Sequence, residues 1–565
     1  MPQRSESHWK GRAASMSDYW ERLNKRRIPR RAALKAGATA MGLAGAALVG
    51  CGDGGEAPAT ETPAAELTPQ HGGNEVIGLP ADPGGLDVQQ SVTGYWVSGN
   101  FNGYLHSVNL DDQKVYPQMA EKVEHVDEVT YVWTLRRGIK FHDIDPTFGR
   151  EVTAEDVVFS MERRRDDPSI MNDKQLLRDY TASMEAPDPY TFRLVNTRPY
   201  APALDEIGNP SYAIIPREAI EKWGDLSQHP VGCGAFILEE YAKAERVRVR
   251  KNPDFYMEGR PFLDSIDWAL IPDVSTLYQA FRTKQHDSCG ATLDKLKVEE
   301  LENTPGVIVR DSPNYWTRCL LLRVDRPPFT DRRLWQAVDL AVDRQDLIDK
   351  MAFGEGRFNG PVSPYLEYWC LPQEEVREFY KVDIAEAKRL VAAAGYEDGL
   401  EVDAPVMNTA NLTKDAEIVR EHLAKIGIKL NIQVRDIAVL LAQHLYAGNF
   451  QMLWFYNLPY VEPDRPLCQW FSKGIAGLSF TGYYSEEMDN WIWRERSEFD
   501  PEKRREIVLD AQRAMMREHG PQINNYTPRG WAARWDWVHT VEEGRGLGLT
   551  SRNFLGIDTW MTARH

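Results

Sequence analysis

The residue with the most specific chemistry is Cys51, which directly follows Leu-Val-Gly. This sequence resembles a lipobox, whose cysteine is acylated and becomes the first residue of the mature chain. Upstream, Arg30 and Arg31 precede a weakly hydrophobic segment, as in a twin-arginine export signal. The apolar run 36–49 has 14 residues, or about 21 Å as a helix against a hydrocarbon core of about 30 Å. We therefore predict an export signal over 1–50 and an extracytoplasmic body held at the cell membrane by lipid, periplasmic where an outer membrane exists.

Motifs for hydrolytic, metal-dependent or nucleotide chemistry do not occur in the sequence. There is no G-x-S-x-G, no H-E-x-x-H and no P-loop, and the 12 histidines lack the spacing of metal ligands. We therefore predict that the chain is not an enzyme and holds no metal ion and no cofactor. One alternative stays open, an exported, lipid-anchored hydrolase whose nucleophile and base come from distant parts of the chain.

The composition indicates an acidic exported body. Residues 1–50 hold 10 of the 67 Lys and Arg and 3 of the 84 Asp and Glu, so the rest carries a net charge of −24. Nucleic acids and anionic membrane surfaces bind basic faces, and we exclude both as partners. The remaining length is enough for two or three domains. Apart from Cys51, the cysteines form no C-x-x-C pair, so we expect buried side chains with at least one free thiol.

The body is predicted to alternate strands and helices. Residues 51–73 are rich in Gly, Pro, Ala, Thr and Glu, which predicts a disordered tether. Beyond it, β-branched and aromatic runs indicate strands, and apolar residues at spacings of three and four, with caps, indicate helices. We expect strands at 130–136, 246–250, 400–406 and 429–435, and helices starting after Thr153 and spanning 383–394 and 413–426. Because the last helix lies between two strands, the predicted fold class is α/β.

Four segments in order resemble signature segments of extracytoplasmic solute-binding proteins of family 5. They are WTLRRGIKFHD with TAEDVVFS (133–143 and 153–160), PVGCGAF (230–236), NPDFY (252–256) and PFTDRR (328–333). Cys233 and Ala235 depart conservatively from the family pattern. This family serves ABC importers for peptides, nickel chelates, opines and some sugars. The resemblance therefore implies a monomeric receptor that delivers a small solute to ABC permease subunits.

The resemblance also implies a fold of the periplasmic-binding-protein type, with three domains and a ligand cleft between two lobes. Lobe I is expected to be discontinuous, over 74–106, 230–314 and 526–565. The inserted domain II is expected over 107–229, and lobe II (domain III) over 315–525. A ligand that contacts both lobes stabilises the closed form, which a permease can distinguish. A receptor that signals to a membrane sensor would share these binding residues, and that alternative stays open.

The charged ligand anchors of the family's peptide binders are missing here. Those proteins hold the ligand's amino terminus with an aspartate, whose position falls on Pro459 or Tyr460, and the dipeptide binders add an arginine in a loop that here spans 405–413 and holds none. We therefore predict not a free zwitterionic dipeptide but a more neutral or aromatic solute, or a sugar. The candidate ligand-binding residues are aromatic or amide side chains: Tyr95, Trp96, Asn408, Asn411, Trp454, Tyr456, Asn457 and Tyr460.

Several of these residues also have a structural interpretation. Trp454 lies in an apolar run and fits a core position, whereas Tyr456 and Tyr460 fit the site better. Asn408 and Asn411 fit a turn between a strand and a helix equally well. Glu462 and Arg465 are expected to be charges on the rim of the site.

Overall fold

The computed structural model describes residues 68–90, 94–109, 114–170, 174–290, 293–312, 314, 316–457, 462–468, 480–541 and 556–564. The chain divides into two units, residues 1–69 and 70–565. Arg30, Arg31 and Cys51, with the predicted export signal and lipid anchor, lie outside the described residues. Within those residues, no helix combines the length and the apolar character needed to cross a bilayer.

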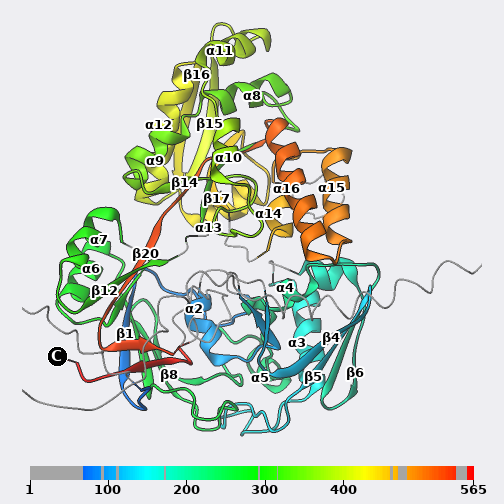
Figure 1. The fold of residues 1–565 in the computed structure, drawn as a ribbon, viewed down its shortest axis with the longest axis vertical. Helices are drawn as coiled ribbons and strands as arrows, with labels where there is room; N and C mark the ends of the chain where they lie inside the picture. The colour runs from blue at the N-terminus through cyan, green and yellow to red at the C-terminus, as the bar shows by residue number, and fades with distance from the viewer. Residues whose placement is uncertain are drawn as a thin grey trace, which may run out of the picture. The chain divides into compact units, whose positions relative to one another are not determined.

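The largest sheet is assembled from widely separated parts of the chain, coloured blue, green and red in Figure 1. Its order is β12 (Val307–Ser312), β20 (Gly530–Trp535), β11 (Ser288–Cys289), β1 (Asn74–Leu79), β10 (Ser265–Leu270), β9 (Arg246–Lys251) and β8 (Phe236–Ala242). The strand predicted at 246–250 is confirmed as β9. The last residues of the predicted tether already contact the body of the protein: the backbone N–H of Gly72 donates to the carbonyl of Phe262 at 2.9 Å.

A four-stranded sheet lies within residues 120–196. Its order is β4 (Ala120–Asp127), β5 (Thr130–Leu135), β7 (Thr191–Asn196) and β6 (Thr181–Asp188). The predicted strand at 130–136 is confirmed as β5. Helix α3 (Ala154–Asp166) starts where predicted, because Thr153 and Asp156 form a capping box that satisfies backbone N–H groups of the first turn.

A five-stranded sheet forms the core of the upper half in Figure 1. Its order is β16 (Ile428–Arg435), β15 (Leu400–Met407), β17 (Met452–Asn457), β13 (Thr317–Leu322) and β18 (Gln522–Asn524). β15 and β16 are the predicted strands, and they pair in parallel through the crossover helix α12 (Ala410–Ala424). α12 starts three residues before its predicted start at 413, because the Thr409 hydroxyl caps the N–H of Leu412 at 3.3 Å. Gly427, at φ +83°, follows the helix as predicted.

Two-stranded pairs and further helices are also present in the described part of the chain. Helix α11 (Ile384–Ala393) confirms the helix predicted at 383–394. In the structure the Asp383 side chain caps its start, and Gly395 follows its end as predicted. Two-stranded pairs are β2 (His106–Val108) with β3 (Val115–Pro117), β14 (Gly356–Phe358) with β19 (Tyr526–Pro528), and β21 (Val538–Thr540) with β22 (Thr559–Met561). The other helices are α2 (Tyr95–Ser98), α4 (Ala203–Ile207), α5 (Arg217–Trp223), α6 (Val274–Arg282), α7 (Lys295–Glu302), α8 (Arg332–Ala341), α9 (Arg344–Ala352), α10 (Gln373–Phe379), α13 (Ile437–Val439), α14 (Asp464–Cys468), α15 (Glu486–Arg496) and α16 (Pro501–Arg517). None of the five described cysteines is in a disulfide.

Buried charged side chains join α14, α15 and α16 to residues from the segment of the four-stranded sheet. Asp464 and Arg496 are both fully buried, and Arg496 donates to Asp464 Oδ2 at 2.9 Å. Two tyrosines from upstream reach this pair: Arg496 donates to the Tyr180 hydroxyl at 2.5 Å, and the Tyr200 hydroxyl donates to Asp464 at 3.2 Å. The pair is therefore satisfied by groups from distant parts of the chain.

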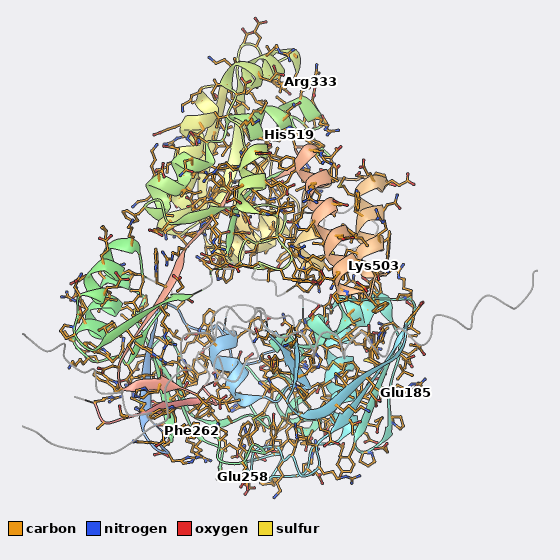
Figure 2. The ribbon with its side chains drawn as sticks, in the orientation of Figure 1. Glu185, Glu258, Phe262, Arg333, Lys503 and His519 are labelled. Carbon is orange, nitrogen blue, oxygen red and sulfur yellow. The ribbon has the colours of Figure 1, made fainter. Side chains whose placement is uncertain are left out.

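Arg504 extends this buried ionic cluster. It donates to Glu495 at 2.9 Å and to Glu462 at 3.1 Å, whereas the neighbouring Lys503 points outward from α16 (Figure 2). Glu462 is 2% exposed and Arg465 is 6% exposed. The expectation that these two residues are rim charges is therefore wrong. Burial raises the pKa of Glu462 to about 8.

Candidate functional site

The candidate site is the edge of the five-stranded sheet at which β15 and β17 end and β13 begins. β15 and β17 are parallel neighbours, with Val406 opposite Trp454, and Thr317 at the start of β13 lies opposite Asn457. In open α/β sheets, ligands bind beyond the carboxyl ends of parallel strands, where the following helix also begins. We call this region, which includes the start of α12, the strand-end edge.

Aromatic side chains form a wall at the strand-end edge. Tyr456 is half-buried, and its ring meets that of Trp316 edge-on, at 4.6 Å between centroids and an angle of 89°. On its other side it stacks on Phe455 at 4.8 Å, and its hydroxyl lies 3.6 Å from the sulfur of Met407. Such a corner offers an apolar face together with a hydroxyl, which suits a solute with a ring or another flat apolar part. Tyr456 therefore lies at the strand-end edge, and its role in ligand binding stays a prediction.

Trp454 lies on the same strand but deeper. It is 1% exposed and belongs to the main hydrophobic cluster of this sheet. The core interpretation therefore describes Trp454 better than a direct contact with ligand. Its indole lies beside the carboxyl of Asp415. Trp454 therefore links the hydrophobic core to a buried acidic side chain under the strand-end edge.

A charged pair lies under the strand-end edge, and the sequence did not reveal it. Arg318, the second residue of β13, is opposite Tyr456 in register, and its side chain is 14% exposed. Its Nε lies 3.4 Å from Oδ2 of Asp415, on α12, and the Asp415 Oδ1 accepts a hydrogen bond from the Tyr526 hydroxyl at 2.7 Å. Burial raises the pKa of Asp415 to about 6, although Arg318 and Tyr526 act to lower it.

The remaining predicted residues are spread over two regions. Asn408 and Asn411 are exposed beside the start of α12. Trp96 is exposed and Tyr95 is half-buried on α2, which Figure 1 draws in the lower half with the seven-stranded sheet. The two regions thus belong to different sheets. Asn457 pairs through its backbone with β13, and Tyr460 lies outside the described residues.

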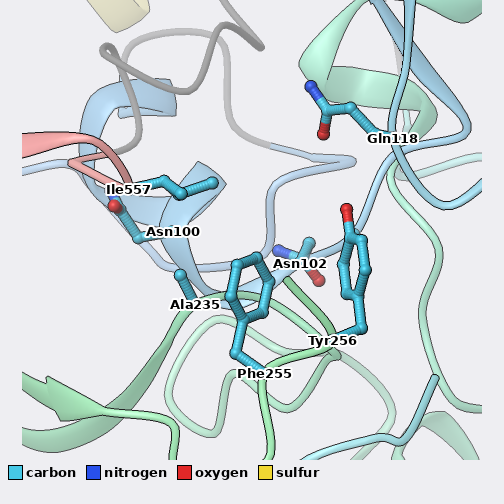
Figure 3. Close-up of a pocket in the computed structure, with 8 residues that line it drawn as sticks. Asn100, Asn102, Gln118, Ala235, Phe255, Tyr256 and Ile557 are labelled. Atoms are coloured by element: carbon cyan, nitrogen blue, oxygen red, sulfur yellow. The ribbon is translucent and has the colours of Figure 1, made fainter. Parts of the chain in front are cut away.

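Two hollows in the described part of the chain differ in the space they offer a solute. The first, lined by Asn100, Asn102, Phe255 and Tyr256 among others, has a volume of about 10 Å³, which suits about one water molecule (Figure 3). The second has about 300 Å³ and is lined by residues 311–312, 354–357, 365, 367, 529 and 530. That volume is at the lower limit for small-molecule sites.

The larger hollow is lined by charges that are already paired. Arg529 donates to Asp311 at 2.7 Å and to Glu355 at 2.9 Å, and Arg357 donates to Glu367 at 3.3 Å. Two of the lining segments lie only a few residues from Arg318 and Tyr526 in the chain. The hollow has room for a small solute, and parts of its lining are near the strand-end edge in the sequence. The aromatic side chains and the buried charged pair, however, lie at the strand-end edge itself.

The family model described as bacterial extracellular solute-binding proteins, family 5 Middle, matches residues 114–477. The chain belongs to family 5. The predicted family is therefore confirmed. Binding proteins of family 5 are extracytoplasmic, deliver their solute to the permease subunits of ABC importers, and are not enzymes.

Individual relatives and structures agree with this membership. This family 5 chain is 27% identical over 427 residues to the glutathione-binding protein GsiB of Salmonella choleraesuis (strain SC-B67), covering 72% of this chain and 80% of that protein. It is 26% identical over 404 residues to GsiB of Escherichia coli O157:H7, covering 69% and 76%. Among solved structures, DppA from Helicobacter pylori in complex with the peptide STSA matches with a TM-score of 0.77 and 23% identity, covering 87% and 98% of the two chains. AgaA in complex with agropinic acid, from A. tumefaciens R10, matches with a TM-score of 0.76 and 22% identity, covering 87% and 99%. The two-lobed α/β fold predicted for this family 5 chain is confirmed by these structures.

Proposed function

We propose that this chain is the membrane-tethered receptor of an ABC importer, anchored by an acyl chain on Cys51 and exported through the Arg30-Arg31 signal. As a monomer, it captures a small solute at the strand-end edge and delivers it to the permease. Its membership in family 5 supports the transport role. The anchor rests on the lipobox-like sequence before Cys51.

The receptor works by closure of two lobes. We propose lobe I over 74–106, 230–314 and 526–565, domain II over 107–229 and lobe II over 315–525. The composition of the three largest sheets supports this division, because each of them takes its strands from one of these three parts. The short pair β14–β19 joins lobe II to the last segment of lobe I. A solute that contacts both lobes favours the closed form by the difference between its affinities for the two forms.

The corner formed by Trp316 and Tyr456 carries the proposal for the solute. This wall suits a small solute with a ring or another flat apolar part, and Asn408 and Asn411 add amide groups near it. The related proteins are named for glutathione, and the similar structures hold a peptide and agropinic acid. No aspartate occupies the peptide-anchoring position near 459–460, so a free dipeptide fits this edge poorly.

A thermal-shift screen of the full chain in detergent tests this proposal. The panel contains glutathione, dipeptides, oligopeptides, agropinic acid, neutral sugars and aromatic solutes. A true ligand at about 100 times its Kd adds roughly 2.7 kcal/mol to the free energy of unfolding. Tyr456→Ala is expected to remove the shift, and Tyr484→Ala, at a tyrosine 69% exposed, serves as the matched control. If no solute of any class stabilises the protein, the transport role is overturned; tight binding of dipeptides overturns the solute class alone.

A further inference from the structure

Arg318 is a buried cation whose charge is only partly balanced. The side chain is 14% exposed, and within the described residues its charge partner is Asp415, at 3.4 Å. Burying an arginine costs free energy unless its donors are well paired. Here the Arg318 Nε and the Asp415 Oδ2 are both buried, and neither has a hydrogen bond of good geometry among the described residues. The pair therefore adds little to the free energy of unfolding, and stability alone does not explain it.

The position of the pair points to a ligand. Arg318 lies opposite Tyr456 in register, below the wall that Tyr456 makes with Trp316. A guanidinium has five N–H donors in one plane. The long contact to Asp415 and a hydrogen bond to the Tyr526 hydroxyl involve only some of these donors, which leaves others for a further acceptor. The arrangement that matches this geometry best is a planar carboxylate, which accepts two parallel hydrogen bonds from one guanidinium.

We propose that Arg318 binds a carboxylate of the transported solute, so that the solute is an organic acid whose apolar part lies on Trp316 and Tyr456. This proposal rests on the proposed transport function and narrows its solute class. The missing arginine of the 405–413 loop is thus replaced by one from a neighbouring strand. A neutral sugar offers Arg318 hydroxyl oxygens as acceptors but no negative charge to balance the guanidinium.

The protonation of Asp415 also supports the binding of a carboxylate by Arg318. The groups that face its carboxyl are Arg318 from β13, Tyr526 from β19 and Trp454 from β17. Because its pKa is about 6, Asp415 can take up a proton near neutral pH when a second carboxylate approaches Arg318. Acids should then bind more tightly as the pH falls through about 6, and Asp415→Asn should remove this dependence.

The test compares acids with their own amides on the full chain in detergent. The probes are glutathione, N-acetyl-tyrosine and agropinic acid, each beside the derivative in which every carboxylate is an amide. Calorimetric titration should show binding of at least one acid, with the matching amide weaker by about 30-fold or more. Arg318→Met should abolish this difference. Arg326→Met, at an exposed arginine beyond the other end of β13, is the matched control and should retain it.

Folding of the variants is kept separate from recognition. If Arg318→Met fails to fold because Asp415 loses its partner, the double variant Arg318→Met with Asp415→Leu removes both charges and takes its place. The proposal is overturned if Arg318→Met or the double variant still prefers acids, if amides bind as well as acids, or if none of the acids binds. If only neutral solutes bind, the proposal that Arg318 binds a carboxylate is overturned, and the proposed transport function stands. If no solute binds, both the carboxylate proposal and the proposed transport function are overturned.

Discussion

Replacing Arg496 by methionine should destabilise the protein strongly. Arg496 and Asp464 are both fully buried, and the substitution removes the charged donor that contacts both oxygens of the Asp464 carboxylate. The Tyr200 hydroxyl at 3.2 Å and the Cys468 thiol at 3.4 Å, which remain, carry no charge. Removing one partner of a buried ion pair costs about 3–5 kcal/mol, because the other charge stays in a medium of low polarity. We expect a loss of this size in the free energy of unfolding for the part of the chain that contains α14–α16.

Scanning calorimetry with hydrogen exchange on α15 measures this loss, since a chain of several domains need not unfold in one step. Arg494→Met, two residues earlier on an exposed position of the same helix, is the control and should cost less than about 1 kcal/mol. Adding Asp464→Leu to Arg496→Met removes the orphaned charge and should recover part of the loss. A cost for Arg496→Met equal to that of the control would refute the reasoning.

Three further outcomes are expected. Cys51→Ala should release the protein from the membrane fraction, and continued partitioning with membranes would contradict the acyl anchor. Arg30→Lys together with Arg31→Lys should stop export, measured by protease protection in whole cells; unchanged export would mean that another route is used. Burial lowers the pKa of His142 to about 4, so this neutral imidazole should contribute stability that is present above pH 6.5 and is lost as the pH falls toward 4. His142→Gln should flatten that part of the stability curve, and an unchanged curve would rule out this histidine as its cause.

Local patterns predicted the elements that depend on local chemistry. Thr153 and the helix after it, and the strands on both sides of α12, follow from capping and periodicity, which act over a few residues. The alternation of strands and helices indicated the α/β class, and the family segments added the two-lobed architecture.

The charged groups were predicted poorly for a physical reason. Glu462 and Arg465 were expected on the surface, and they are buried because their partners come from distant parts of the chain. Arg318 and Asp415 likewise meet only through the tertiary structure, so no spacing in the sequence announces them. A charged residue within an apolar strand, as in the run Thr317 to Leu322, was the one available signal.

The place of β20 in the seven-stranded sheet limits when this sheet can form during synthesis of the chain. β20 is inserted between β11 and β12, although it is among the last strands to leave the ribosome. Until Gly530–Trp535 has been synthesised, β11 and β12 have exposed edges with unpaired backbone groups, which favour aggregation. The four- and five-stranded sheets need no residue beyond Asn524 and can form earlier. A nascent chain that stops short of β20 therefore exposes strand edges that chaperones and proteases can bind. The seven-stranded sheet, which contains β1 and β20, can be completed only after nearly the whole chain has been synthesised.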